Sequence, residues 1–377
     1  MWRLIIAVIL FLLSLLTVFK APTNFFWRVA VAVTEFPYIP IVITLIFFFL
    51  FYKAKLFRIP SLLTLGAAFV FFSLPIVQAY IKGGELKNKF NVAFPSKEKS
   101  GQLEQAFSIS KMFSGIGFEQ VEPKILTYKK LQERDLNIDY YPAFTKDKLP
   151  CVIVIHGGSW KEGDSKQLSD LNSYLVHRGY NVAAMNYRLA PKYKFPAPIE
   201  DTKDVLNYLT QHAEELHIDT NNFVLLGRSA GGQIALVAGY TFHDPRIKGI
   251  ISFYAPADMA WGATIKTNKW VLDVDAVFSA YLGGLIGEMP EVYEKSTARN
   301  FVTPDSPPTL LIHGPNDALV SYHHSERLET ELITKKVPYY FLSLPWATHG
   351  CDYNINGPSG QASTYTIERF INSVTKR

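Results

Sequence analysis

Residues 223–240 read FVLLGRSAGGQIALVAGY, which is the pattern of a strand, a tight turn and a helix. The apolar run 223–226 predicts a buried strand, and 231–240 predicts a helix. Between them the letters GRSAG match a G-x-S-x-G pattern. A sharp turn from strand to helix lifts the serine hydroxyl above the sheet, and glycine fits beside it where a side chain would not. Ser229 is therefore the candidate nucleophile.

The rest of the second half of the chain alternates between strand-like and helix-like segments. Strands are predicted at 125–129, 136–141, 151–155, 181–185, 249–254, 309–313 and 339–344. Helices are predicted at 165–178, 199–215, 322–335 and 362–375. This alternation predicts an α/β protein with a mostly parallel sheet and helices on both faces. An insertion at 259–308 is expected over the carboxyl ends of the strands, where such sheets bind ligands.

Two more polar residues follow predicted strands at that same edge. Asp317 ends the stretch HGPND, and His349 lies in WATHG at 346–350. The order Ser, Asp, His allows one site to gather all three residues. A serine hydroxyl needs an adjacent base, and the base needs an acid that fixes its tautomer. The pattern predicts Ser229 as nucleophile, His349 as general base and Asp317 as the orienting acid.

The stretch HGGSW at 156–160 directly follows the predicted strand 151–155. Glycines there let the backbone approach a reacting carbonyl group. The candidate oxyanion-hole donors are the backbone N–H groups of Gly157, Gly158 and Ala230. We interpret His156 as a brace for this loop and not as the catalytic base.

Other polar residues have simpler interpretations. Asp201 starts a predicted helix, where capping explains an acid. Asp258 follows a strand and stays open as an alternative to Asp317. His323 and His324 are adjacent, lack the spacing of a helical metal pair, and are interpreted as a solvated helix start. No metal site is predicted, and the two cysteines match neither a disulfide scaffold nor a Cys-based zinc site.

The first 81 residues are far more apolar than the rest. The chain has 377 residues and a net charge of +5 without a dense Lys/Arg block, so nothing indicates nucleic-acid binding. Apolar runs at 2–19, 36–52 and 59–81 are each near the roughly 17–25 residues that cross a bilayer as a helix. We therefore predict about three transmembrane helices within 1–81, a linker and packing helix at 82–120, and a catalytic domain at 121–377.

The charged residues between the apolar runs indicate on which side of a membrane the catalytic domain would lie. Lys53, Lys55 and Arg58 lie between the second and third runs without an acid. By the positive-inside tendency this loop is cytoplasmic, which predicts a multi-pass membrane protein with an extracytoplasmic catalytic domain. Three lysines directly after the third run favour the opposite orientation, so that alternative stays open.

From about Val121 onward the chain resembles the α/β-hydrolase esterases, in particular the hormone-sensitive-lipase-like and feruloyl-esterase-like branches. The resemblance rests on HGGSW at 156–160, NYRLAP at 186–191, FPAP at 195–198, GRSAGG at 227–232, PPTLLIHG at 307–314 and LPWATHG at 344–350. It implies the α/β-hydrolase fold and assigns nucleophile, acid and base to Ser229, Asp317 and His349. Arg228 departs from the acidic residue that many members carry before the serine. Membrane spans are absent from the common soluble members.

The predicted function is cleavage of carboxylic esters through an acyl-enzyme on Ser229, without a metal or organic cofactor. Trp160, Trp346 and the aromatic insertion favour an apolar acyl or aryl substrate, either a small molecule or a lipid-like ester. Two alternatives stay open. One is an acyltransferase on the same triad, and the other is a membrane scaffold with an inactive hydrolase fold.

Overall fold

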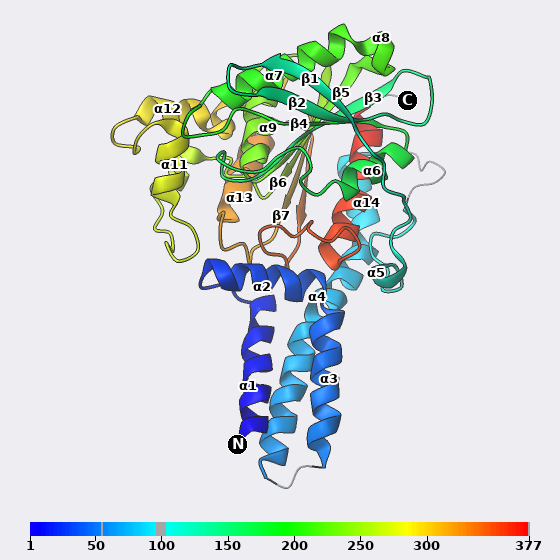
Figure 1. Cartoon of the computed structure of the whole chain (residues 1–377), viewed down its shortest axis with the longest axis vertical. Coiled ribbons are helices and arrows are strands. Elements are labelled where there is room, and N and C mark those ends of the chain that lie inside the picture. The colour runs from blue at the N-terminus through cyan, green and yellow to red at the C-terminus, as the bar shows by residue number, and fades with distance from the viewer. Residues whose placement is uncertain (54–55, 96–102, 376–377) are drawn as a thin grey trace.

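The computed structural model describes residues 1–53, 56–95 and 103–375, so Lys55 and part of the predicted linker lie outside the described residues. Within those ranges one sheet has eight strands in the order β1-β2-β4-β3-β5-β6-β7-β8. The pairs β1–β2 and β2–β4 are antiparallel, and all other neighbours run parallel. This mixed sheet with helices on both sides matches the α/β-hydrolase fold, which confirms the predicted fold class (Figure 1).

The strand positions agree with the apolar pattern of the sequence. They are β1 Lys124–Lys130, β2 Asp135–Tyr141, β3 Leu149–Ile155, β4 Asn181–Met185, β5 Ile218–Arg228, β6 Ile247–Phe253, β7 Thr309–His313 and β8 Tyr339–Ser343. Strands β4 and β7 are buried along their whole length. Continuous apolar runs are expected there because helices cover both faces of the sheet.

Two apolar clusters fill the space between the sheet and its helices. One face carries α7 Ala197–Gln211 and α9 Ala230–Thr241, and the other carries α6 Asp170–His177 and α14 Pro358–Val374. The remaining short helices are α5 Lys111–Ser114 and α8 Ala213–Leu216, and α13 spans His323–Thr334. The predicted insertion contains α10 Met259–Gly262, α11 Val274–Leu282, α12 Pro290–Ser296 and the 3₁₀ turn η2 Ala298–Phe301.

The N-terminal region forms a stalk and a helix that lies across its end (Figure 1). The stalk consists of α1 Trp2–Ser14, extended by η1 Leu15–Thr17, of α3 Tyr38–Tyr52, and of the first part of α4 Arg58–Ala93. The crossing helix α2, Asn24–Glu35, meets α3 at 86°. Within the described residues α4 is long and apolar enough to cross a membrane. Helices α2 and α3 together are long and apolar enough only if the bent pair forms one span. The predicted set of three separate spans is therefore not confirmed.

Helix α4 continues past Ile81, where the linker was expected to begin. Leu86 and Phe90 are fully buried, and the Phe90 ring packs against Tyr340 of β8 with a centroid distance of 5.3 Å. Leu86 and Phe90 are four residues apart and therefore share one face of the helix, while the charged residues between them occupy the other. The predicted boundary at 81 falls inside one continuous helix that belongs to both the stalk and the hydrolase core.

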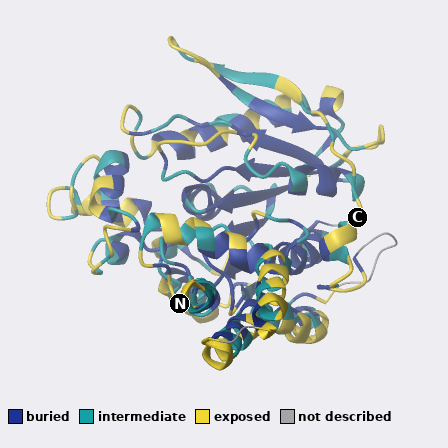
Figure 2. Ribbon diagram, turned by 60° about the horizontal axis from the view of Figure 1, so that its bottom comes forward, coloured by how far each residue is buried: buried dark blue, intermediate teal, exposed yellow. Residues whose placement is uncertain are grey.

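The stalk exposes apolar side chains on all three helices. Examples are Ile5, Ile9 and Leu12 on α1, Ile46, Phe49 and Leu50 on α3, and Leu63, Val70 and Val77 on α4. Figure 2 shows buried residues concentrated in the sheet and its covering helices, with many exposed residues along the stalk. Exposed apolar side chains that gather in this way are a feature of surfaces that contact other proteins or membranes.

The two cysteines are buried and free. Cys151 lies near the start of β3, whereas Cys351 follows His349 at the opposite end of the parallel strands. Burial raises the pKa of both thiols above the ordinary range. Both side chains therefore serve as small apolar groups in the core.

Candidate active site

Ser229 lies on the sharp turn between β5 and α9. Its backbone has φ 52° and ψ −117°, and its N–H donates to the Phe253 carbonyl at 2.9 Å. A Cβ on Gly227 would lie 2.1 Å from the Gly231 oxygen, and a Cβ on Gly231 would lie 2.2 Å from the Ile155 oxygen. Only glycine fits at these two positions because the backbones approach so closely. The strained serine and its two glycines form the turn that the sequence predicted.

The three residues of the predicted triad lie within hydrogen-bonding distance of one another. Ser229 Oγ is 3.0 Å from His349 Nε2, and His349 Nδ1 donates to Asp317 Oδ2 at 2.7 Å. They follow β5, β8 and β7, whose carboxyl ends meet at one edge of the sheet. Asp317 and His349 are buried, while Ser229 is partly exposed. This arrangement lets His349 accept the Ser229 proton as the hydroxyl attacks a substrate.

A second histidine also holds Asp317. His313 Nε2 donates to Asp317 Oδ2 at 3.0 Å, and the N–H groups of Leu319 and Val320 donate to Oδ1 at 2.8 Å. Burial alone would raise the pKa of Asp317, but the facing His349 and the bond from His313 outweigh it and hold that pKa well below its usual range. His313 ends β7 in the same HGPND stretch, but the pattern alone did not predict it as a second partner of Asp317.

The alternative acid, Asp258, has hydrogen-bond partners other than His349. Its carboxylate accepts from Arg327 Nε at 2.8 Å and from Arg299 Nη1 at 3.3 Å, and it caps α10 through the Trp261 N–H. His324, which was expected to be solvated, is buried beside it and accepts from the Asp258 N–H at 3.3 Å. Burial lowers the pKa of His324 to about 3, so it stays neutral. Asp258 therefore stabilises the insertion, and Asp317 serves His349.

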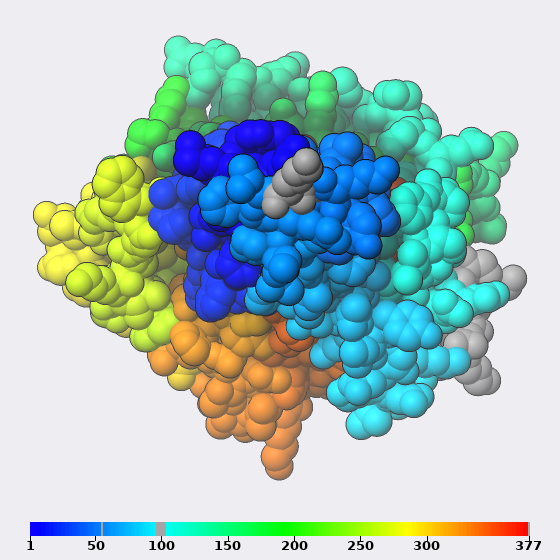
Figure 3. All heavy atoms as spheres, turned by 90° about the horizontal axis from the view of Figure 1, so that it is seen from below, coloured from blue at the N-terminus to red at the C-terminus, as the bar shows by residue number. Residues whose placement is uncertain are grey.

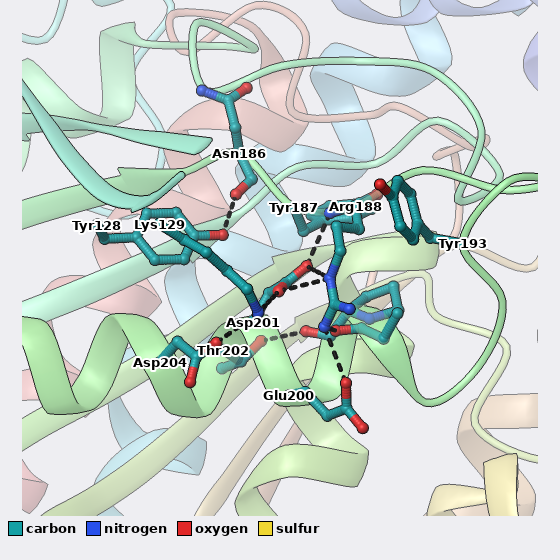
Figure 4. Close-up of polar contacts among 12 residues, drawn as sticks. Tyr128, Lys129, Asn186, Tyr187, Arg188, Tyr193, Glu200, Asp201, Thr202 and Asp204 are labelled. Atoms are coloured by element: carbon teal, nitrogen blue, oxygen red, sulfur yellow. Dashed lines mark hydrogen bonds and ion pairs between the residues drawn. The ribbon is translucent and has the colours of Figure 1, made fainter. Parts of the chain in front are cut away.

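Asp201, which was expected to cap a predicted helix, lies at the centre of a separate polar cluster (Figure 4). It accepts from the backbone N–H and Nε of Arg188, both at 2.8 Å, and from Lys129 Nζ at 3.0 Å. It is not a capping residue as expected, because α7 begins earlier, at Ala197. The cluster fixes the NYRLAP stretch to α7 and to β1.

The HGGSW loop lies beside Ser229, but one of its predicted oxyanion-hole N–H groups already donates a hydrogen bond within the protein. The Gly157 N–H donates to Gln167 Oε1 at 2.7 Å, a side-chain contact that the motif could not reveal. Within the described residues the N–H groups of Gly158 and Ala230 have no hydrogen-bond partner. His156 stacks on Tyr187 at 4.2 Å, and burial lowers its pKa to about 4, as expected for a brace.

The two predicted substrate-binding tryptophans differ in position. Trp160 stacks on Tyr281 at 4.4 Å, donates to Gln233 Oε1 at 3.0 Å, and lines the cavity in front of Ser229. Trp346 is fully buried on the α14 side and donates to Ser359 Oγ at 2.8 Å. The prediction for Trp346 is therefore wrong, because its ring turns into the core beneath the His349 loop.

A cavity of about 380 Å³ reaches Ser229 and Ala230. The insertion supplies much of its lining, including Val271, Val277 and Phe278, and so lies next to the Ser229 turn at the carboxyl end of β5. The turn after β7 adds further apolar side chains. Residues 20–22, between the stalk and α2, also line the cavity, which the sequence analysis did not predict.

The sequence model of the BD-FAE family matches residues 136–332, more than half of the chain. The chain belongs to the BD-FAE family. The BD-FAE match runs from β2 into α13 and includes Ser229 and Asp317, whereas His349 lies beyond its end.

Curated relatives of this BD-FAE chain include esterases of Mycobacterium tuberculosis. Esterase LipC is 26% identical over 239 residues, which cover 60% of this chain and 58% of LipC. Carboxylesterase NlhH is 30% identical over 182 residues, which cover 43% of this chain and 57% of NlhH. The chain thus spans little more than half the length of these relatives.

Solved structures also resemble the BD-FAE chain. An acetyl ester-xyloside bifunctional hydrolase from Caldicellulosiruptor lactoaceticus has a TM-score of 0.58 at 22% identity, over 67% of this chain and 97% of that one. An esterase from Rhizomucor miehei has a TM-score of 0.59 at 18% identity, over 70% and 87% of the two chains. At these identities the likeness establishes the fold alone.

Helix α2 packs directly against the loop that carries the BD-FAE chain's His349. Trp27 Nε1 donates to the His349 carbonyl at 2.9 Å. Glu35 accepts from the Ser359 N–H at 3.1 Å and from its hydroxyl at 2.6 Å, and the Glu35 carbonyl accepts from Asn354 at 2.8 Å. Both ends of the His349 loop are therefore fixed by a helix from the N-terminal region.

Trp27→Phe should lower kcat roughly tenfold, since small misplacement of a catalytic group is costly. The substitution removes the bond to the His349 carbonyl but keeps most of the ring packing. KM should stay near the wild-type value because Trp27 does not line the cavity. Steady-state kinetics on a soluble ester would measure both constants. Trp2→Phe, at the far end of α1, is the matched control, and equal kcat values for the two variants would contradict the prediction.

The Glu35 carboxyl should make stability depend on pH. Burial raises its pKa from 4.5 to about 8. Between these values the folded chain keeps a proton that the unfolded chain releases, so stability should fall as pH rises through this window. Glu35→Gln should flatten that decline, as measured by unfolding temperature from pH 5 to 9. Parallel curves for wild type and variant would contradict the prediction.

Arg228, the departure from the usual motif, points away from the cavity. It is buried and forms an ion pair with Asp352, and its guanidinium lies over the Phe253 ring at 5.6 Å. Tyr254 donates to the same carboxylate and packs on His349 with a ring distance of 4.4 Å. The ion pair of Arg228 with Asp352 therefore joins the Ser229 turn to the His349 loop, and the charge of Arg228 does not face the cavity.

Proposed function

We propose that this chain is a membrane-anchored serine hydrolase that cleaves carboxylic esters. The observation that carries the proposal is the continuous chain of hydrogen bonds from Ser229 through His349 to Asp317 beside a cavity of about 380 Å³. The esterase names of the curated relatives support the same reaction class.

In the proposed reaction Ser229 Oγ attacks the acyl carbon while His349 Nε2 takes its proton. Asp317 keeps the imidazole in the required tautomer and stabilises its positive charge. The N–H groups of Gly158 and Ala230 are free to hold the oxyanion, whereas that of Gly157 is engaged by Gln167. His349 then protonates the leaving alcohol. Water, activated by His349, hydrolyses the acyl-enzyme and restores the serine.

The cavity wall suits an apolar acyl or aryl group. Val271, Val277 and Phe278 face the space in front of Ser229, and Trp160 is fixed there by its stacking on Tyr281. Burying apolar atoms against this wall favours binding by roughly 25 cal/mol per Å² of apolar surface removed from water.

A fluorophosphonate probe tests the nucleophile. It should label the wild-type protein on Ser229, whereas an unlabelled protein that hydrolyses no ester would favour the inactive scaffold. Product analysis with and without an added alcohol separates hydrolysis from acyl transfer. A free acid as the main product in both cases supports the hydrolase.

The stalk is the proposed membrane anchor, with α1, α3 and the first part of α4 as its spans. At 1.5 Å per residue the 16 residues of Trp2–Thr17 extend about 24 Å, so this span is short for a hydrocarbon core of about 30 Å. Helix α2 then lies at the surface of the bilayer. Lys53 and Arg58 flank the turn at the distal end of the stalk and favour an extracytoplasmic hydrolase domain.

We expect the protein to stay in the membrane fraction after washes with high salt and with alkaline buffer, because apolar burial and not surface charge would hold it. Protease added to intact cells should digest the hydrolase domain. Release by the alkaline wash would contradict the anchor. Digestion only after lysis would place the domain on the cytoplasmic side.

A further inference from the structure

The mouth of the active-site cavity lies beside the end of the stalk. Lys20, Ala21 and Pro22, which follow α1, form part of the lining. The Pro22 carbonyl accepts from Asn268 Nδ2 at 2.9 Å, so this segment is joined to the insertion. In Figure 3, seen from the stalk side, the N-terminal segments (blue), the insertion (yellow) and the segment after β7 (orange) meet around the stalk. The cavity is therefore walled by the segment that follows the first stalk helix.

Exposed aromatic side chains surround this junction. Phe19 is 63% exposed, Phe25 is 68% exposed and Trp270 is 81% exposed. The Asn24 N–H donates to the Trp270 carbonyl at 2.9 Å, which places the tip of the insertion next to the start of α2. Tryptophan is enriched at the interface of a bilayer, and phenylalanine is common on the apolar face of helices that lie in that interface. The surface next to the cavity-lining segments 20–22 and 265–268 thus has side chains that suit contact with a membrane.

The mouth of the cavity also carries positive charge. Lys20 and Lys266 line it from the N-terminal segment and from the insertion, and both are exposed. Neither forms an ion pair with a described residue, whereas the neighbouring Lys269 pairs with Asp273. Among the described lining residues the one acid is Asp317, whose carboxylate is occupied by the two histidines. The two lysines are free to face an anionic group of a substrate.

We infer that the cavity takes acyl esters of membrane lipids with a phosphate-bearing anionic headgroup, drawn directly from the adjoining leaflet. This inference rests on the proposed function and names its substrate class. The apolar wall receives the acyl chain, and Lys20 and Lys266 face the headgroup. Attack by Ser229 breaks the ester C–O bond and transfers the acyl group, and water then releases it. The products are a carboxylic acid and a lipid with one newly freed hydroxyl at the cleaved ester position.

The test uses full-length protein in vesicles that contain either phosphatidylglycerol or phosphatidylcholine with identical acyl chains. Released fatty acid is the readout, and a short uncharged soluble ester is the third substrate. Two lysines near a lipid surface should favour the anionic lipid roughly tenfold or more. The preference should shrink at about 1 M salt because the Debye length falls to about 3 Å.

The double variant Lys20→Gln/Lys266→Gln should bring the ratio of anionic to zwitterionic lipid cleavage close to one. The matched control, Lys130→Gln/Lys146→Gln, removes the same charge from exposed residues far from the cavity and should keep the wild-type ratio. Fluorophosphonate labelling of each variant checks that the triad is intact.

The possible outcomes are distinguishable. Cleavage of the soluble ester without cleavage of either lipid would overturn this inference and leave the ester hydrolase standing. Equal cleavage of both lipids, or an unchanged ratio in the double variant, would also overturn it. A protein that cleaves no ester and takes no fluorophosphonate would overturn the proposed function itself.

Discussion

Ser229→Ala is expected to abolish ester hydrolysis, with a loss in kcat on the order of 10⁶, as when a serine protease loses its nucleophile. The hydroxyl bonds to His349 and occupies the end of the cavity where an acyl carbon would lie. No other described hydroxyl is within hydrogen-bonding distance of His349 Nε2. The initial rate on a short p-nitrophenyl ester measures the effect.

The same variant should remain folded. Alanine fits the turn sterically, since it only deletes the hydroxyl, and the Ser229 backbone bond to Phe253 is kept. An unfolding temperature close to wild type would confirm this. Ser373→Ala, on the outer part of α14, is the control for preparation and handling. Activity of pure Ser229→Ala within tenfold of this control would remove Ser229 as the nucleophile.

Asp317→Asn is expected to lower kcat by roughly 10⁴, the loss seen when a triad acid becomes an amide. Here Asp317 Oδ2 accepts from His349 and from His313 at once. An amide oxygen could still accept from one of them, but its NH₂ group would face donors elsewhere in the site. His349 would then lose the tautomer that leaves Nε2 ready for the serine proton. Steady-state kinetics measure the loss.

Asp258→Asn is the matched control for the acid. Asp258 is equally buried, but it serves two arginines and the start of α10, so kcat should change far less than in Asp317→Asn. Its unfolding temperature should fall, because removing a buried charge leaves Arg327 and Arg299 short of a partner. If the two variants rank the other way in kcat, the assignment of the acid is wrong.

Much of the hydrolase domain could be predicted because its signals are local. Buried parallel strands such as β3 and β7 are short apolar runs that end in glycine-rich or polar turns. The triad residues follow such strands, so their order in the chain was enough to bring them together. Ser229, His349 and Asp317 accordingly lie within hydrogen-bonding distance of one another, and their catalytic roles stay a prediction.

The contacts that could not be predicted join segments far apart in the chain. Trp27 and Glu35 lie between apolar runs and resembled a short connection, yet they hold a loop more than 300 residues away. Gln167 engages the Gly157 N–H through a side chain outside the HGGSW motif. The residues next to Trp346 in the sequence do not indicate whether its ring faces the cavity or the core. Each of these contacts depends on tertiary packing, which the periodicity of the sequence does not predict.

Helix α2 lies between the stalk and the His349 loop, and this has a kinetic consequence. A hydrolase on a flexible tether would sample the bulk solution above the bilayer. Here the bonds of Trp27 and Glu35 hold the His349 loop in one position relative to the stalk, the proposed anchor. Under the proposed membrane anchoring and lipid substrate, an enzyme fixed in this way would meet its lipid by lateral diffusion, so its rate would follow the mole fraction of ester in the leaflet. Diluting the ester with inert lipid in the same vesicles should slow turnover, whereas adding buffer should not.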